Sequence, residues 1–144
     1  PSGQQLSGAI VCDGPLLWNR RCASVGPENR CFLRSLRCAA ADTSDSGGDI
    51  DGMIAFCAQP LAQMKPGATV IPGHGPITDL KALEDYIKML ETIRGRVSKM
   101  MDDGMTMEEV VGAKITQDYD GRYGDESASL GFVNRVYTSL KKKR

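Results

Sequence analysis

The chain has 144 residues, of which 41% are hydrophobic, enough for one domain with its own core. Its 18 Lys and Arg residues balance 18 Asp and Glu residues, so net charge favours neither nucleic acid nor an anionic membrane as a partner. No apolar run is long enough to span a bilayer, and no secretory signal is visible. The first residue is Pro1 rather than Met, so we expect the natural start upstream and take the cytoplasm as the default location.

Residues 1–45 differ in composition from the rest of the chain. They hold four of the five cysteines, five arginines and no lysine. Their apolar residues keep neither the period of a strand nor that of a helix, and only residues 6–11 and 32–36 are predicted as short strands or a turn of helix. We therefore predict an irregular N-terminal segment at 1–45 and an ordered region at 46–144.

The five cysteines have wide and irregular spacing; they are Cys12, Cys22, Cys31, Cys38 and Cys57. They form no C-x-x-C pair of the kind that binds zinc, and an odd number does not suit a closed disulfide framework. Because nothing in the sequence indicates an oxidising compartment, we predict free thiols.

A helix is predicted over residues 47–64. Ser46 or Asp49 is suited to cap it, because a short side-chain oxygen accepts hydrogen bonds from the free N–H groups of the first turn. Pro60 lies inside the pattern, where it removes a hydrogen bond and clashes with the preceding turn, so we expect a kink or an early end there. The apolar stripe of this helix consists of Ile50, Met53, Ile54, Cys57 and Leu61.

A β-branched run at residues 69–71 predicts a buried strand, which Pro72 and Gly73 end. His74, the only histidine, then lies between two glycines, which let the backbone approach another group closely. A histidine at the end of a strand is typical of a metal ligand or a general base. The structural alternative is a histidine that only hydrogen-bonds to backbone within a turn.

A long amphipathic helix is predicted over residues 79–103. Thr78 is its predicted N-cap, Gly104 its predicted C′ residue, and Glu84 and Lys88 its predicted i,i+4 ion pair. Its apolar stripe comprises Leu80, Leu83, Ile87, Leu90, Ile93, Val97, Met100 and Met101.

Two shorter helices are predicted over residues 106–112 and 127–142, with a polar loop between them. Thr106 and Glu109 have the spacing of a capping box, in which each side chain accepts from the other's backbone N–H. The basic run at residues 141–144 places cations at the negative end of the last helix. We interpret this run as a solvated helix terminus rather than a nucleic-acid patch.

The sequence Pro-Gly-His-Gly-Pro at residues 72–76 resembles the last motif of the metallo-β-lactamase fold hydrolases. Residues 47–55 resemble the helix before that motif in one hydrolase branch, residues 77–97 the long helix after it, and residues 104–119 the branch's C-terminal tail. The resemblance, from residue 46 to residue 140, covers only the C-terminal part of the family's domain. It implies a helix-rich α/β fold, namely the C-terminal part of an αββα sandwich.

The resemblance also implies a metal-dependent hydrolase lineage. In that family two divalent metals, usually zinc, polarise a small-molecule ester, thioester, lactam or similar substrate and activate a bridging water. Carried over to this sequence, only His74 matches a metal ligand. The family's H-x-H-x-D-H motif is absent, whereas a catalytic zinc normally takes three protein ligands. We therefore expect an incomplete zinc site, no assignable catalytic residue and no activity of the chain alone.

Candidate oxygen ligands lie upstream of the histidine at Asp42, Asp45, Asp49 and Asp51. Carboxylates alone favour harder ions such as Mg²⁺ or Ca²⁺, and this spacing is not that of an EF-hand. We therefore interpret this stretch as a loop and a helix cap. Asp13 resembles the family's bridging-aspartate turn but lies far upstream of the histidine.

Three hypotheses about function stay open. The chain is part of a zinc hydrolase, or a non-catalytic, helix-rich remnant or binding module, or a segment that completes a site with another chain. Half a sandwich would leave apolar faces uncovered, which predicts self-association.

The origin of residues 1–45 is also open. Composition and resemblance change together near residue 42, so one hypothesis is translation from a shifted reading frame. The alternative is a divergent N-terminal segment. Translation of the encoding DNA in the other frames tests the first hypothesis, which fails if no frame restores family-like strands and ligands.

Overall fold

The structure, a computed structural model, describes residues 9–11, 23–25, 30–33, 49–72, 76–123 and 126–143, with the backbone alone for the first three ranges. These residues form a small sheet and a larger helical part, so the predicted helix-rich, mixed α/β class is confirmed. Among the described residues, no helix combines the length and the apolarity needed to cross a membrane.

The chain divides into two compact units. Unit 1 contains residues 1–37 and 55–85, and unit 2 contains residues 38–54 and 86–144. The sequence predicted a boundary at residue 45 between an irregular segment and an ordered region. That boundary rests on composition and periodicity, and it stays a prediction.

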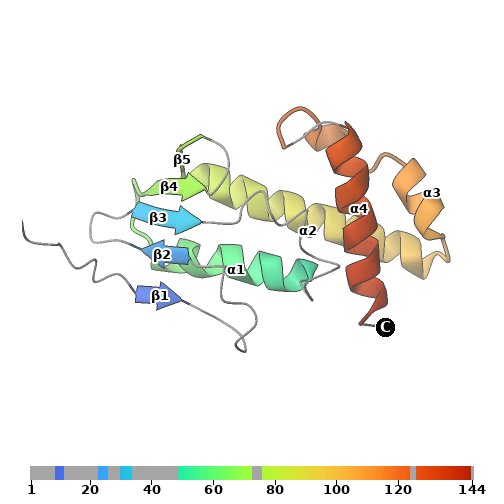
Figure 1. Cartoon of the computed structure of the whole chain (residues 1–144), viewed down its shortest axis with the longest axis horizontal. Helices are drawn as coiled ribbons and strands as arrows, with labels where there is room; N and C mark the ends of the chain where they lie inside the picture. The colour runs from blue at the N-terminus through green and yellow to red at the C-terminus, as the bar shows by residue number, and fades with distance from the viewer. Residues whose placement is uncertain are drawn as a thin grey trace, which may run out of the picture. The chain divides into compact units, whose positions relative to one another are not determined.

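Unit 1 holds a five-stranded sheet in the order β1-β2-β3-β4-β5, which Figure 1 shows side by side. The strands are β1 (Ala9–Val11), β2 (Ala23–Val25), β3 (Arg30–Leu33), β4 (Thr69–Pro72) and β5 (Thr78–Asp79). The β3–β4 pair is parallel, and the other three neighbouring pairs are antiparallel. Val70 of β4 is completely buried, which explains why its β-branched run forms a strand.

The sequence predicted one of these strands, β4, and left two further segments open between a short strand and a turn of helix. The strand expected at residues 69–71 is β4, and the short segments expected at 6–11 and 32–36 overlap β1 and β3. β2 was not predicted, because three residues are too few to establish a period. Its pairing with β1 and β3 places it in the sheet.

Helix α1 (Ile50–Gln63) matches the helix predicted over residues 47–64. Asp49 caps it, since the Gly52 N–H donates to Asp49 Oδ1 at 2.8 Å; Ser46, the other candidate cap, lies outside the described residues. The helix does not end at Pro60 but continues for three more residues, and Pro60 itself is buried. Burial of this ring offsets part of the cost of the lost hydrogen bond.

Helix α2 (Leu80–Asp102) confirms the long helix predicted over residues 79–103, but the predicted cap is wrong by one residue. The Ala82 N–H donates to Asp79 Oδ1 at 2.8 Å, so Asp79 rather than Thr78 is the N-cap. The reason is that β5 extends through Asp79, which leaves Asp79 directly before the first helical residue, Leu80, and Thr78 one position too early. Thr and Asp are both good caps, so composition alone does not choose between neighbours.

The ion pairs of α2 also differ from the prediction. Lys81 pairs with Asp85 at 3.4 Å and Lys99 pairs with Asp103 at 3.1 Å, both at i,i+4 spacing. The expected pair of Glu84 with Lys88 does not occur among these contacts. Each such exposed pair contributes only a few tenths of a kcal/mol, so the long helix depends on its buried face.

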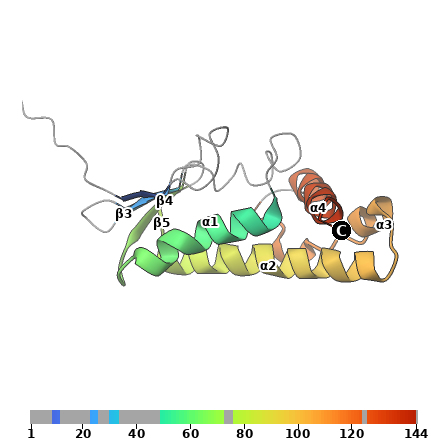
Figure 2. The same ribbon diagram turned by 90° about the horizontal axis from the view of Figure 1, so that it is seen from below.

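Unit 2 combines most of α2 with α3 (Met107–Gly112), a 3₁₀ turn (Gln117–Tyr119) and α4 (Glu126–Lys141). Figure 2 shows α3 and α4 beside the C-terminal half of α2. The predicted capping box is confirmed: Thr106 accepts from the Glu109 N–H, and Glu109 accepts from the Thr106 N–H. The buried core of unit 2 consists of Ile50, Met53, Ile87, Met89, Leu90, Ile93, Val97, Val110, Ile115, Val133, Val136 and Leu140.

Candidate functional site

The sequence placed the candidate metal ligand His74 in the turn after β4. His74 lies outside the described residues, as do Asp13, Asp42 and Asp45, so the structure gives these side chains no geometry. The structure does describe the strands on either side of His74, β4 before it and β5 after it. β4 ends at Pro72, and Val70 pairs with Thr78 of β5, so the chain reverses direction between these two paired residues.

The two sides of this turn differ in exposure. Ala68 and Val70 before it are buried, and they anchor β4 in the core of unit 1. Ile77 after it is 68% exposed, and it is the large hydrophobic side chain that the described surface leaves open. An exposed apolar side chain beside a strand is suited to contact a ligand or another chain, although one such residue is also ordinary on a protein surface.

The remaining two aspartates of the candidate oxygen-ligand set are described, and they belong to an ion-pair network in unit 2. Lys143 Nζ lies 2.9 Å from Asp49 Oδ1 and 2.7 Å from Asp51 Oδ2. Arg94 Nε donates to the other oxygen of Asp51. We call these four residues, Asp49, Asp51, Arg94 and Lys143, the charge clasp.

The charge clasp shifts the pKa values of its members. Burial alone would raise the pKa of Asp49, but the Gly52 N–H and the Lys143 ammonium outweigh burial and hold that pKa below its ordinary value. The hydrogen bond from Arg94 lowers the pKa of Asp51 against the opposing effect of burial, and Lys143 adds to it. The two aspartates in turn raise the pKa of Lys143. All three shifts favour the charged, paired state.

These shifts predict acid sensitivity of the clasp. A carboxyl whose pKa is lowered by folding contributes stability above its unfolded pKa, about 4 for Asp, and this contribution disappears as the pH falls through the lower folded pKa. We expect Asp51→Asn to lower the urea midpoint at pH 7 and to change it much less at pH 2.5. The corresponding loss of unfolding free energy at pH 7 is at most about 1 kcal/mol, because these side chains are a third or more exposed. An equal loss at both pH values contradicts the assignment.

A second cluster holds the loop after α3 against α2. Arg96 pairs with Asp118 at 2.6 Å, and its guanidinium lies 6.0 Å from the ring centroid of Tyr119. The ring of Tyr123 lies 6.3 Å from that of Tyr119 and 5.7 Å from that of Tyr86. Each ring therefore already contacts another ring or a cation, and we interpret the cluster as a clamp on the loop rather than a ligand site.

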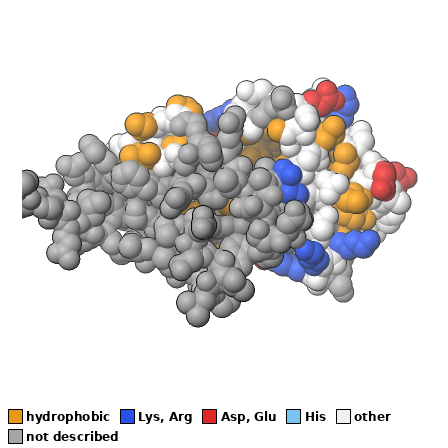
Figure 3. All heavy atoms as spheres, viewed as in Figure 1, with side chains coloured by type: hydrophobic (Ala, Val, Ile, Leu, Met, Phe, Trp, Pro, Cys, Tyr) orange, Lys and Arg blue, Asp and Glu red, His pale blue; other side chains and the backbone are white. Residues whose placement is uncertain are grey.

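The basic end of the chain was predicted to be a solvated helix terminus. Lys141 and Lys143 are exposed, but Lys143 is also committed to the charge clasp. On the face drawn in Figure 3, the described surface carries Lys and Arg side chains as well as Asp and Glu side chains. Cys57 is buried and takes part in no disulfide bond. The other four cysteine side chains lie outside the described set, so the prediction for them stays open.

The described residues do not supply the ligands of a complete zinc site. The chain has one histidine, and a catalytic zinc normally takes three protein ligands. Among the described residues, no three His, Cys, Asp or Glu side chains lie close enough together to hold a metal ion. Asp49 and Asp51 already bond to Lys143 and to Arg94 or the Gly52 N–H, so a metal would have to displace these partners.

The sequence did not predict that Arg94, Ser139 and Lys143 converge on the start of α1. Lys143 is 94 residues from Asp49 along the chain, and no periodicity reports on a pair so far apart. Comparison of the chain with protein-family models, with curated proteins and with solved structures found no match.

Proposed function

We propose that this chain derives from the C-terminal part of a metal-dependent hydrolase of the metallo-β-lactamase lineage, with His74 as one zinc ligand. The observation that supports this proposal is the sequence Pro-Gly-His-Gly-Pro, which begins at the end of strand β4 and precedes a long amphipathic helix, α2. The resemblance of the flanking segments on both sides supports it as well. Its substrate would be a small molecule with an ester, thioester, lactam or similar bond.

In this proposal the chain alone is catalytically incomplete. The H-x-H-x-D-H motif is absent from these 144 residues, so the other ligands would come from a further polypeptide segment. Zinc, once bound by a full ligand set, would supply a Lewis acid and an activated water. What this chain would contribute is one imidazole at a strand end and the helices around it. The cytoplasm stays our proposed location.

Zinc content after dialysis tests the proposal. We expect little zinc in the chain alone, and near-stoichiometric zinc when the chain is mixed with a polypeptide that carries an H-x-H-x-D-H half-domain. His74→Ala should abolish that gain, because a single lost ligand lowers affinity steeply. Zinc binding that is the same with and without His74, or no zinc in any mixture, would overturn the assignment. Stoichiometric zinc in the chain alone would mean that further ligands lie within it.

A second candidate is a non-catalytic, helix-rich binding module. The observation that favours it is that Asp49 and Asp51 are engaged in the charge clasp rather than open to a metal. In this case neither zinc nor hydrolysis follows from any mixture. Self-association through uncovered apolar faces stays a prediction of both candidates.

A further inference from the structure

The beginning of α1 and the end of α4 are joined inside unit 2 by two kinds of contact. One kind is neutral: the Ile50 N–H donates to Ser139 Oγ at 3.1 Å in a buried position. The other kind is ionic and consists of the charge clasp, through Lys143. Both act on the first turn of a helix, whose N–H groups have no partners within the helix itself.

Asp49 links the two kinds of contact. Its Oδ1 atom accepts from the Gly52 N–H at 2.8 Å and also lies 2.9 Å from Lys143 Nζ. The same carboxylate therefore caps α1 and binds the ammonium group. The ammonium group of Lys143 fixes the carboxylate of Asp49 in place. Loss of the ammonium group should therefore also loosen the cap that Asp49 forms on α1.

We propose that the residues just after α4 form a charge-operated strap, in which the ammonium of Lys143 holds the first turn of α1 closed and its neutralisation releases that turn locally. The ionic contacts of the strap are partly exposed to solvent. The side chains of Lys143, Asp49 and Asp51 are 44%, 37% and 36% exposed, so the ionic contacts are open to salt and to chemical modification of the amine. The buried bond to Ser139 is neutral and does not respond to charge.

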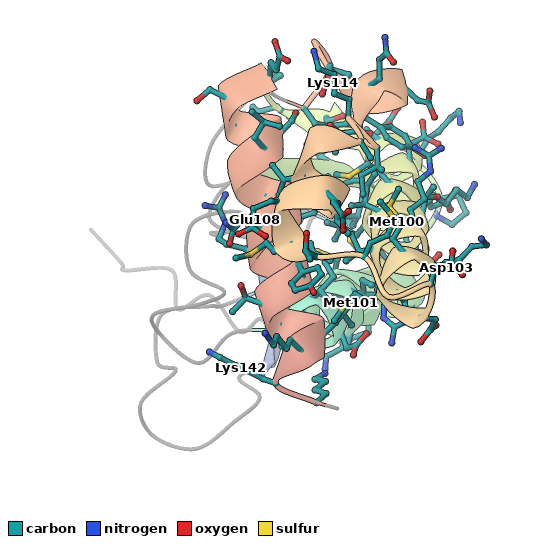
Figure 4. The ribbon with its side chains drawn as sticks, turned by 90° about the vertical axis from the view of Figure 1, so that its right-hand side faces the viewer. Met100, Met101, Asp103, Glu108, Lys114 and Lys142 are labelled. Carbon is teal, nitrogen blue, oxygen red and sulfur yellow. The ribbon has the colours of Figure 1, made fainter. Side chains whose placement is uncertain are left out.

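Lys141 offers a matched control for Lys143. Lys141 is exposed and lies in the last turn of α4, two residues before Lys143, without a contact to either aspartate. Figure 4 shows this end of α4, with Lys142 extending outward from it. Lys143→Gln and Lys141→Gln remove the same charge from the same helix end, so their helix-dipole effects are similar.

Hydrogen exchange of the full-length chain at low salt tests the strap. We expect Lys143→Gln to speed exchange in a peptide spanning residues 49–54 by about threefold or more, the size of an exposed ion-pair contribution. Lys141→Gln should leave this peptide unchanged, and neither variant should change a peptide from α3. High salt should speed the wild-type peptide and remove the difference between wild type and Lys143→Gln.

A second readout follows the amine itself. Trace acetic anhydride acetylates only an unprotonated lysine. The amine nitrogen attacks one carbonyl carbon, the C–O bond to the leaving acetate breaks, and the nitrogen loses a proton to the buffer as the amide forms. We expect Lys143 to react more slowly than Lys141, and Asp51→Asn to speed the reaction at Lys143. The strap is overturned if Lys143→Gln leaves residues 49–54 unchanged, if Lys141→Gln has the same effect, or if exchange rises equally in α3, which would mean a global loss of stability.

Discussion

Leu90→Ala is expected to lower the free energy of unfolding by about 2–5 kcal/mol. Leu90 lies in the middle of α2 and has no exposed surface, and Ile93 and Val97 on the same stripe are equally buried. Truncation removes three carbons from a close-packed core, so the loss combines the transfer free energy of those atoms with the cost of the cavity. Urea unfolding followed by far-ultraviolet circular dichroism measures the difference.

The control for this variant is the next residue of the same helix. Glu91 is exposed, so Glu91→Ala should change the free energy of unfolding by no more than about 0.5 kcal/mol. Both variants place alanine in the helix, so helix propensity does not explain a difference between their losses of unfolding free energy. Equal destabilisation by both would mean that the apolar stripe of α2 does not form the core of unit 2.

The helices could be predicted because their signals are local. The stripe on α2 repeats every three or four residues, and the capping box of α3 needs only Thr106 and Glu109. The choice between Thr78 and Asp79 as the cap of α2 failed because it depends on where β5 ends. That end is fixed by pairing with β4, a tertiary contact with no trace in the local sequence.

The charge clasp lay beyond prediction for a similar reason. Asp49 and Asp51 were identified from the sequence, but as candidate oxygen ligands, and Lys143 as part of a solvated basic run. Their meeting requires α1, α2 and α4 to be packed first, which places residues 92 and 94 positions apart within hydrogen-bond distance. For the candidate metal site, the sequence predicted His74 at a strand end. His74 lies outside the described residues, so its placement stays a prediction, and the structure describes only the pairing of β4 with β5 on either side of it.

Helix α2 offers a pair of glycine substitutions with opposite expected signs, one at Gly104 after its last turn and one at Gly95 in its interior. Gly104 has a φ of +81°, and it closes the helix: its N–H donates to the Met101 carbonyl at 3.1 Å, and the Met105 N–H donates to the Met100 carbonyl at 3.0 Å. These two hydrogen bonds form a Schellman motif, and they confirm the predicted C′ position of Gly104. Figure 4 shows Met100 and Met101 in the last turn, with Asp103 in the turn that follows.

Gly104→Ala should therefore destabilise the chain by about 1–2 kcal/mol, because a β-carbon disfavours the left-handed conformation. No atom lies within 4 Å of the β-carbon that alanine would add, so the cost is conformational rather than steric. Gly95 lies in the helical interior of α2 with the same open space around it, and Gly95→Ala should stabilise by about 0.5–1 kcal/mol. The two variants add the same methyl group to the same helix. A shift of equal sign in their urea midpoints would show that the backbone of Gly104 is not left-handed, and that α2 ends in another way.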